Sequence, residues 1–130
     1  MVSPSSRALK IFVVENHDDT LVYLSGYLRS CGHQVDCARD MASALEGLEG
    51  RRIDVLISDI GLPDGDGWQL MEKVRQGGGA IPFGIAMSGY SLPADIEKSH
   101  RAGYRHHLVK PFVPDDLDVL LREAAGGPSN

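Results

Sequence analysis

Four short apolar segments of the chain are each followed by a side chain that could do chemistry. These side chains are Glu15, Asp59, Ser88 and Lys110. A carboxylate can act as a nucleophile or bind a hard cation. A hydroxyl and an ammonium can stabilise a transferred phosphoryl group. The four residues are therefore candidates for one site, provided that the fold brings them together.

The apolar segments alternate with amphipathic ones along the chain. Short, β-branched runs predict strands, and apolar residues spaced three or four apart predict helices. The expected strands are 9–14, 34–38, 53–58, 81–87 and 105–109. The expected helices are 18–31, 41–49, 68–76, 93–102 and 114–124. Either Asp18 or Asp19 is the expected N-cap of the first helix, since both are of a type preferred there.

This alternation predicts an α/β fold with a parallel sheet. Parallel neighbours need a long return connection, which a helix supplies, and the helices then cover both faces of the sheet. In such folds ligands bind at the carboxyl ends of the strands. The candidate side chains all follow strands, so we expect them to meet at that edge.

The residues around these strand ends resemble the receiver domain of two-component response regulators. The resemblance rests on four stretches, and it covers about residues 9–124, nearly the whole chain. The stretches are Val13–Asn16, Ser58–Gly67, Ala86–Gly89 and Val109–Phe112. The resemblance implies a doubly wound, flavodoxin-like fold: five helices around a five-stranded parallel sheet of order 2-1-3-4-5. It also implies a switch that accepts a phosphoryl group.

The resemblance assigns the acidic residues to phosphoryl transfer and to Mg²⁺ binding. Asp59 matches the phosphoacceptor, which receives the group from a phosphohistidine. Glu15 matches the first acidic metal-binding residue, and Asn16 occupies the position of the second. Asp59 and the main-chain carbonyl of Gly61 match the remaining Mg²⁺ ligands.

The same resemblance assigns residues that respond to the phosphoryl group. Ser88 matches the hydroxyl that hydrogen-bonds to it, and Lys110 matches the lysine that pairs with one of its oxygens. His107 occupies the switch position, where an aromatic side chain often moves inward on activation. A half-exposed strand histidine without a switching role is an equally good interpretation of His107.

Asn16 departs from the family pattern, because an amide brings no charge to the metal. Mg²⁺ should therefore bind less tightly, and two interpretations stay open. The first is a phosphorylatable receiver. The second is a degenerate receiver that acts through protein contacts without phosphorylation. An enzyme, such as an aspartyl-phosphate phosphatase, would need a second aspartate at the position of Gly61, so we do not expect one.

The composition of the chain indicates which classes of partner and which cellular compartment to expect. The chain has 130 residues and a formal net charge of −5, so it has no global positive field for nucleic acid. The expected partner is a histidine kinase or a histidine phosphotransfer protein, with a possible homodimer through the face near the fifth strand. No segment predicts a membrane span, and the two cysteines suit a reduced, cytoplasmic protein. Residues 1–8 and 125–130 are expected to be a flexible N-terminal tail and a C-terminal tail or linker.

Two metal-site interpretations of other residues are not favoured by spacing. The five histidines and two cysteines lack structural-zinc spacing. His106 and His107 are neighbours on a strand and should point to opposite faces. The segment from Asp64 to Gly67 begins like a calcium-binding loop, but its later positions do not fit one.

Overall fold

The computed structural model describes residues 8–89 and 92–126, so the N-terminal tail and the end of the C-terminal tail lie largely outside the described residues. Within them, five parallel strands form one sheet in the order β2-β1-β3-β6-β7. The sheet strands are β1 (Lys10–Val14), β2 (Gln34–Ala38), β3 (Val55–Asp59), β6 (Phe83–Ser88) and β7 (His106–Val109). The helices are α1 (Asp18–Ser30), α2 (Met41–Leu48), α3 (Gly67–Gln76), α4 (Pro93–Ala102) and α5 (Pro114–Ala124). The expected strand order of 2-1-3-4-5 is confirmed, because the labels β4 and β5 belong to a separate hairpin.

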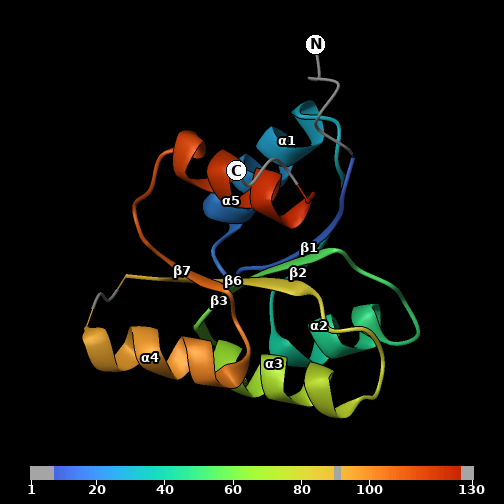
Figure 1. Cartoon of the computed structure of the whole chain (residues 1–130), viewed down its shortest axis with the longest axis vertical. Helices are drawn as coiled ribbons and strands as arrows, with labels where there is room; N and C mark the ends of the chain where they lie inside the picture. The colour runs from blue at the N-terminus through green and yellow to red at the C-terminus, as the bar shows by residue number, and fades with distance from the viewer. Residues whose placement is uncertain (1–7, 90–91, 127–130) are drawn as a thin grey trace.

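The helices form one layer on each face of the sheet. Figure 1 shows α1 and α5 on one face and α2, α3 and α4 on the other. Strand β1 contributes to both layers: Ile11 and Val13 pack toward α1 and α5, whereas Phe12 and Val14 pack in the cluster on the other face. This alternation follows from the two-residue period of a strand. It explains why the central strands are apolar throughout.

Two strands begin two residues later than the sequence predicts. Segments 53–58 and 81–87 were expected as strands, but pairing begins at Val55 in β3 and at Phe83 in β6. Pro82 has no N–H to donate to a ladder, so β6 starts after it. The prediction of Asp18 or Asp19 as the N-cap of α1 is wrong, because His17 is the cap and makes no side-chain cap bond.

A short hairpin leads from β3 into α3 and reinforces two helices. Strand β4 (Gly61–Leu62) pairs with β5 (Gly65–Asp66). The carboxylate of Asp64, in the turn, accepts hydrogen bonds from the backbone N–H groups of Met41 and Ala42 at 2.7 and 2.9 Å. Asp66 forms a capping box with Gln69 at the start of α3. The two acidic residues that begin like a calcium loop therefore stabilise helix ends.

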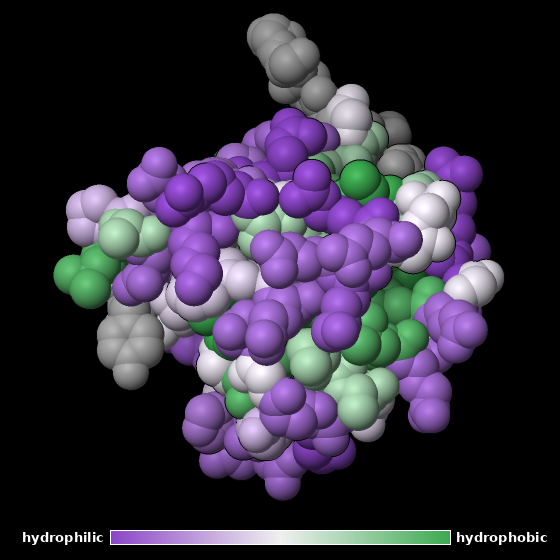
Figure 2. All heavy atoms as spheres, turned by 90° about the horizontal axis from the view of Figure 1, so that it is seen from below, coloured by the Kyte–Doolittle hydropathy of each residue, from purple (hydrophilic) through white to green (hydrophobic). Residues whose placement is uncertain are grey.

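The outer surface of the α2, α3 and α4 layer is mostly hydrophilic. Figure 2 looks at the molecule from this side and shows hydrophobic side chains between hydrophilic ones. None of the helices in the described ranges combines the length and the hydrophobicity that crossing a bilayer requires.

Candidate functional site

The strand register brings the candidate residues to one edge of the sheet. Val14, directly before Glu15, pairs with Ser58, directly before Asp59. Ser88 pairs with Val109, which directly precedes Lys110. Glu15, Asp59 and Ser88 are all buried. The expected convergence at the carboxyl ends of the strands is therefore present.

Lys110 binds both carboxylates at this edge. Its ammonium donates to Glu15 Oε1 at 2.7 Å and to Asp59 Oδ2 at 2.9 Å. The Lys110–Pro111 peptide bond is cis, and the Lys110 backbone N–H donates to the carbonyl of Ser88 at 2.7 Å. The end of β7 thus places the ammonium of Lys110 between Glu15, which follows β1, and Asp59, at the end of β3.

The pKa values of the two carboxyls shift in opposite directions. Burial raises the pKa of Asp59; the hydrogen bond from Lys110 opposes this, and the charge of Glu15 helps to leave it above its usual value. Burial also acts to raise the pKa of Glu15, but hydrogen bonds from Lys110 and His17 outweigh it and hold that pKa below its usual value. Burial acts to lower the pKa of Lys110, and its two carboxylate partners reverse this and raise it. With both carboxyls ionised, the cluster holds two negative charges around one positive charge.

His17 joins the acidic cluster, although the sequence pattern gave it no role. Its backbone N–H and its ring Nδ1 both lie 3.0 Å from Glu15 Oε2. One donor atom each from Glu15, His17 and Asp59 lie within 4.8 Å of one another. Two buried carboxylates at this spacing fit a divalent cation, because such ions prefer hard oxygen ligands.

The other expected metal-binding residues lie beside this cluster. Asn16 is exposed and lies between Glu15 and His17. The Gly61 backbone N–H lies 3.3 Å from Asp59 Oδ1, so the loop after β3 stays close to the carboxylate.

His107 links the site to two helices. Its Nε2 lies 2.9 Å from the Ser88 hydroxyl, and its Nδ1 lies 2.8 Å from the hydroxyl of Ser99 on α4. Ser99 is fully buried and also accepts a hydrogen bond from the indole N–H of Trp68 on α3 at 2.9 Å. His106, in contrast, pairs with Glu123 on α5, so the two neighbouring histidines do point to opposite faces. We call the connected set of Ser88, His107, Ser99 and Trp68 the switch chain.

The roles of Ser99 and His17 could not be read from the sequence. Ser99 lies 31 residues from Trp68, and only the packing of α4 against α3 brings them together. His17 is close to Glu15 in sequence, and that proximity at a strand end was the one available signal. A search for metal-binding groups of histidines and cysteines missed His17, because its neighbours in the site are the carboxylates of Glu15 and Asp59.

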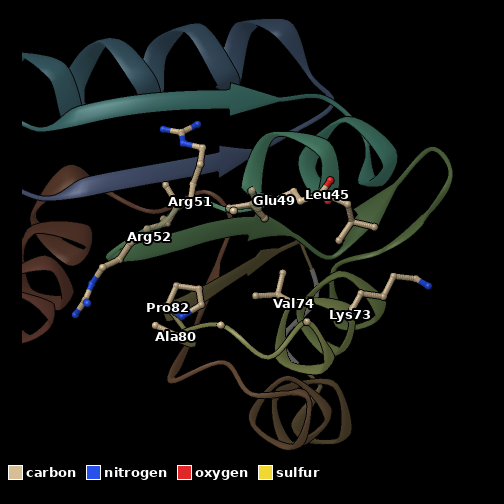
Figure 3. A pocket seen from close by; sticks show the side chains of 13 residues that line it. Leu45, Glu49, Arg51, Arg52, Lys73, Val74, Ala80 and Pro82 are labelled. Atoms are coloured by element: carbon tan, nitrogen blue, oxygen red, sulfur yellow. The ribbon is translucent and has the colours of Figure 1, made fainter.

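A pocket at the other end of the sheet is separate from this site. It has a volume of about 700 Å³ and lies near the start of β3 and β6, between the ends of α2 and α3. Figure 3 shows the charged ends of Arg51, Arg52 and Lys73 directed away from it. The carboxyl ends of the strands, and the acidic cluster, lie at the opposite edge.

Comparison with known proteins gives a family for this arrangement. The sequence model of the response regulator receiver domain matches residues 11–122. The chain belongs to this family. It is a receiver domain of two-component signalling, and the resemblance noted from the strand ends is confirmed.

Curated relatives include both long and short proteins. The receiver domain is 31% identical over 121 residues to the sensor histidine kinase RcsC of Salmonella typhimurium, matching 93% of this chain and only 12% of that kinase. It is also 32% identical over 117 residues to an uncharacterized 14.6 kDa protein of Leptolyngbya boryana, with 88% of each chain covered. The chain therefore spans about an eighth of the kinase and most of the small protein.

A solved structure supports the fold and offers a precedent for the cation. The receiver domain of the sensor histidine kinase PA1611 from Pseudomonas aeruginosa superposes with a TM-score of 0.83 and 27% identity, covering 93% of this chain and all of the other. That protein holds a magnesium ion in its active-site cleft. Receiver domains as a family bind Mg²⁺ at their acidic site, and the carboxylates of Glu15 and Asp59 form such a site here.

Proposed function

We propose that this receiver domain accepts a phosphoryl group on Asp59 from a phosphohistidine, and that the new charge switches its conformation. The observation that carries the proposal is the ammonium of Lys110 between the carboxylates of Glu15 and Asp59. Burying charged groups costs several kcal/mol for each ion before pairing offsets it, so a buried cluster of this kind is more typical of a functional site than of the core alone.

The reaction needs a carboxylate nucleophile and a phosphorylated imidazole. One carboxylate oxygen of Asp59 attacks phosphorus, and the bond from phosphorus to the donor nitrogen breaks. That nitrogen keeps the electron pair, and the ring leaves as neutral imidazole because its other nitrogen already carries a proton. The product is an acyl phosphate on Asp59.

Lys110 and Ser88 are positioned to hold the transferred group. Lys110 can exchange a carboxylate partner for a phosphoryl oxygen without leaving the site. The Ser88 hydroxyl lies at the end of the neighbouring strand and can donate to a second oxygen. Such preorganised donors stabilise charge that spreads over the phosphoryl oxygens during transfer.

Mg²⁺ fits the oxygen ligands available at this edge. Glu15, Asp59, the amide oxygen of Asn16 and the main-chain carbonyl of Gly61 are all hard oxygen donors. When bound, the cation neutralises charge on the phosphoryl oxygens. Asn16 contributes an oxygen but no charge, and this should weaken binding.

The switch chain offers a route from the phosphoryl group to the surface. When Ser88 turns its hydroxyl toward the phosphoryl group, His107 must change its hydrogen bonding as well. The change would reach α4 through Ser99 and the face formed by α4, β7 and α5. This face exposes apolar side chains, which suit contact with another protein or a second copy of the chain. They are Leu92, Val109, Val113 and Val119.

The proposed donor is a histidine kinase or a histidine phosphotransfer protein, and the proposed setting is the cytoplasm. We propose residues 9–124 as the unit that carries the function, with flexible segments on either side. Homology to a segment of a sensor kinase supports this type of partner.

The test is a mass measurement after incubation with Mg²⁺ and acetyl phosphate. Wild type should gain the mass of one phosphoryl group, and Asp59→Asn should gain none, since the amide has the same shape but does not attack. Asp54→Asn is the matched control, because it alters an aspartate at the other end of β3. A phosphorylated Asp59→Asn protein would place the acceptor elsewhere.

Asn16 favours a second candidate, a degenerate receiver that acts through protein contacts without phosphorylation. Under this alternative, wild type would gain no mass from acetyl phosphate or from a phosphorylated kinase. Recovery of phosphorylation in Asn16→Asp would then identify the lost charge as the cause.

A further inference from the structure

We propose that His17 supplies a nitrogen ligand to the cation site, so that the site selects Mn²⁺ and Co²⁺ over Mg²⁺. The inference rests on the proposed function, because it concerns the cation beside the proposed phosphoacceptor. It adds a ligand, and with it a stronger preference for these transition metals than the oxygen ligands alone would give.

The first argument is the position of the imidazole. His17 is the N-cap residue of α1, and its ring contacts Glu15 on the edge where Asp59 lies. The three donor atoms lie within 4.8 Å of one another, close enough for all three to become ligands of one ion. Two carboxylate oxygens and one imidazole nitrogen are therefore neighbours at this edge of the sheet.

The second argument is that Lys110 binds only one of the two oxygens of each carboxylate. Lys110 binds Glu15 Oε1 and Asp59 Oδ2. Glu15 Oε2 instead faces His17, and Asp59 Oδ1 receives a long hydrogen bond of 3.3 Å from the Gly61 N–H. Lys110 therefore leaves one oxygen of each carboxylate, and the remaining oxygen of Glu15 faces His17, so a cation bound beside that oxygen need not displace the lysine.

The third argument is the freedom of the His17 ring. Its side chain is 73% exposed, and its ring hydrogen-bonds only to Glu15 among the described residues. It makes no side-chain cap bond to α1. A ring that turns a nitrogen toward a cation would therefore give up its hydrogen bond to Glu15 but no helix-cap bond.

Ligand chemistry then sets the preference. Mg²⁺ takes oxygen ligands almost exclusively, so an imidazole adds little to its binding. Imidazole suits transition-metal ions, and affinity for a mixed nitrogen and oxygen site rises from Mn²⁺ through Co²⁺. Asn16 lowers the negative charge on which Mg²⁺ depends most. The same two features, one charge fewer and one nitrogen more, both move the preference away from Mg²⁺.

The experiment compares dissociation constants for the three cations in the full chain. Free Mn²⁺ is followed by electron paramagnetic resonance, Co²⁺ by its visible absorption, and Mg²⁺ by calorimetry. The test variant is His17→Gln, which keeps a polar side chain with an oxygen but removes the nitrogen. The control is His100→Gln, an exposed histidine on α4 whose ring contacts the carbonyl of Tyr104. Circular dichroism confirms that each variant folds.

We expect wild type to bind Mn²⁺ and Co²⁺ more tightly than Mg²⁺. His17→Gln should weaken Mn²⁺ and Co²⁺ binding by about tenfold or more and remove the nitrogen signature from the Co²⁺ spectrum. Its Mg²⁺ affinity should stay within about twofold of wild type, because Mg²⁺ gains little from nitrogen. His100→Gln should change none of these constants.

Two outcomes separate this inference from the proposed function. If Asp59→Asn weakens cation binding but His17→Gln leaves the Mn²⁺ affinity and the Co²⁺ spectrum unchanged, the inference is overturned and the phosphoacceptor site stands. An equal loss for all three cations would also overturn it, since His17 would then act on the fold of the site. If wild type binds none of the cations in a manner sensitive to Asp59→Asn, both proposals fail.

Discussion

Lys110 holds together two carboxylates that would otherwise repel each other. It donates to one oxygen of each, and the negative charges still outnumber the positive one. The pKa of Asp59 is raised and that of Glu15 is lowered, so the unfavourable ionisation in this cluster is that of the proposed phosphoacceptor. The ionised form of Asp59 is thus buried and only partly stabilised by Lys110. A bound cation would stabilise it further.

This imbalance predicts that Asp59→Asn stabilises the protein in the absence of metal. A folded-state pKa above the unfolded value of 3.8 means that charged Asp59 destabilises the native state, and this penalty disappears as pH falls below both values. We expect the variant to exceed wild type by about 1 kcal/mol at pH 7, the typical size of a single-substitution effect. The difference should shrink toward zero below pH 3.8.

Urea unfolding in EDTA at several pH values measures this difference. Asp54→Asn, at the other end of β3, is the comparison. A destabilised Asp59→Asn at neutral pH would mean that the hydrogen bond from Lys110 outweighs the repulsion from Glu15.

Asn16→Asp should tighten Mg²⁺ binding by adding a charge. One more charge at about 4 Å is worth up to roughly 4 kcal/mol at an effective dielectric of 20, and desolvation and repulsion by the other carboxylates offset most of it. The net gain expected is therefore about tenfold or less. Fluorescence of Trp68, the only tryptophan, offers a readout. An unchanged Mg²⁺ affinity would show either that the amide of Asn16 already serves as a ligand or that residue 16 does not face the cation.

At the scale of elements, the buried hydroxyl of Ser99 connects α4 to the site. Ser99 contacts both the His107 ring and the Trp68 indole. Removing it takes a hydrogen-bond partner from each, at a cost of about 1–3 kcal/mol for buried polar groups. Helix α4 has few large apolar side chains of its own, so this attachment matters more here than in the other helices.

Ser99→Ala should therefore destabilise the protein by about 1–3 kcal/mol and reduce the response of Trp68 fluorescence to the phosphoryl mimic beryllofluoride. Ser30→Ala is the control, since the hydroxyl of Ser30 donates to a backbone carbonyl of its own helix. A variant of normal stability with a full fluorescence response would show that the switch chain does not pass through α4.

The elements themselves were largely predictable, whereas the contacts between them were not. Strand and helix periods depend on local sequence, and the strand order followed from the family resemblance. The boundary at Pro82 was missed because the apolar run continues through it. The caps supplied by Asp64 to α2, and the bond from Trp68 to Ser99, join residues more than 20 positions apart. Such pairs depend on how the layers pack, and no local pattern encodes them.

At the scale of the whole molecule, the sheet separates two layers that the site must connect. Neighbouring residues of β7 face different layers: His106 pairs with Glu123 on α5, and His107 with Ser99 on α4. Any shift of β7 would therefore change its contacts with α5 on one face and with α4 on the other. Lys110 directly follows this strand and reaches across to β1 and β3, so it is the residue best placed to pull on it.

Lys110→Ala should lower stability and also separate phosphoryl binding from the distant response. Loss of the ammonium leaves two buried carboxylates without their counter-ion, at a cost of about 1–3 kcal/mol given that the lysine is partly exposed. NMR shifts around His107 and α4 should then respond weakly to beryllofluoride in the variant, while shifts near Asp59 still report binding. Lys73→Ala, an exposed lysine on α3, should match wild type in both respects. If Lys110→Ala binds the mimic and shows the full wild-type shifts on the α4 face, Lys110 is not the link, and the signal must pass through Ser88 and His107 alone.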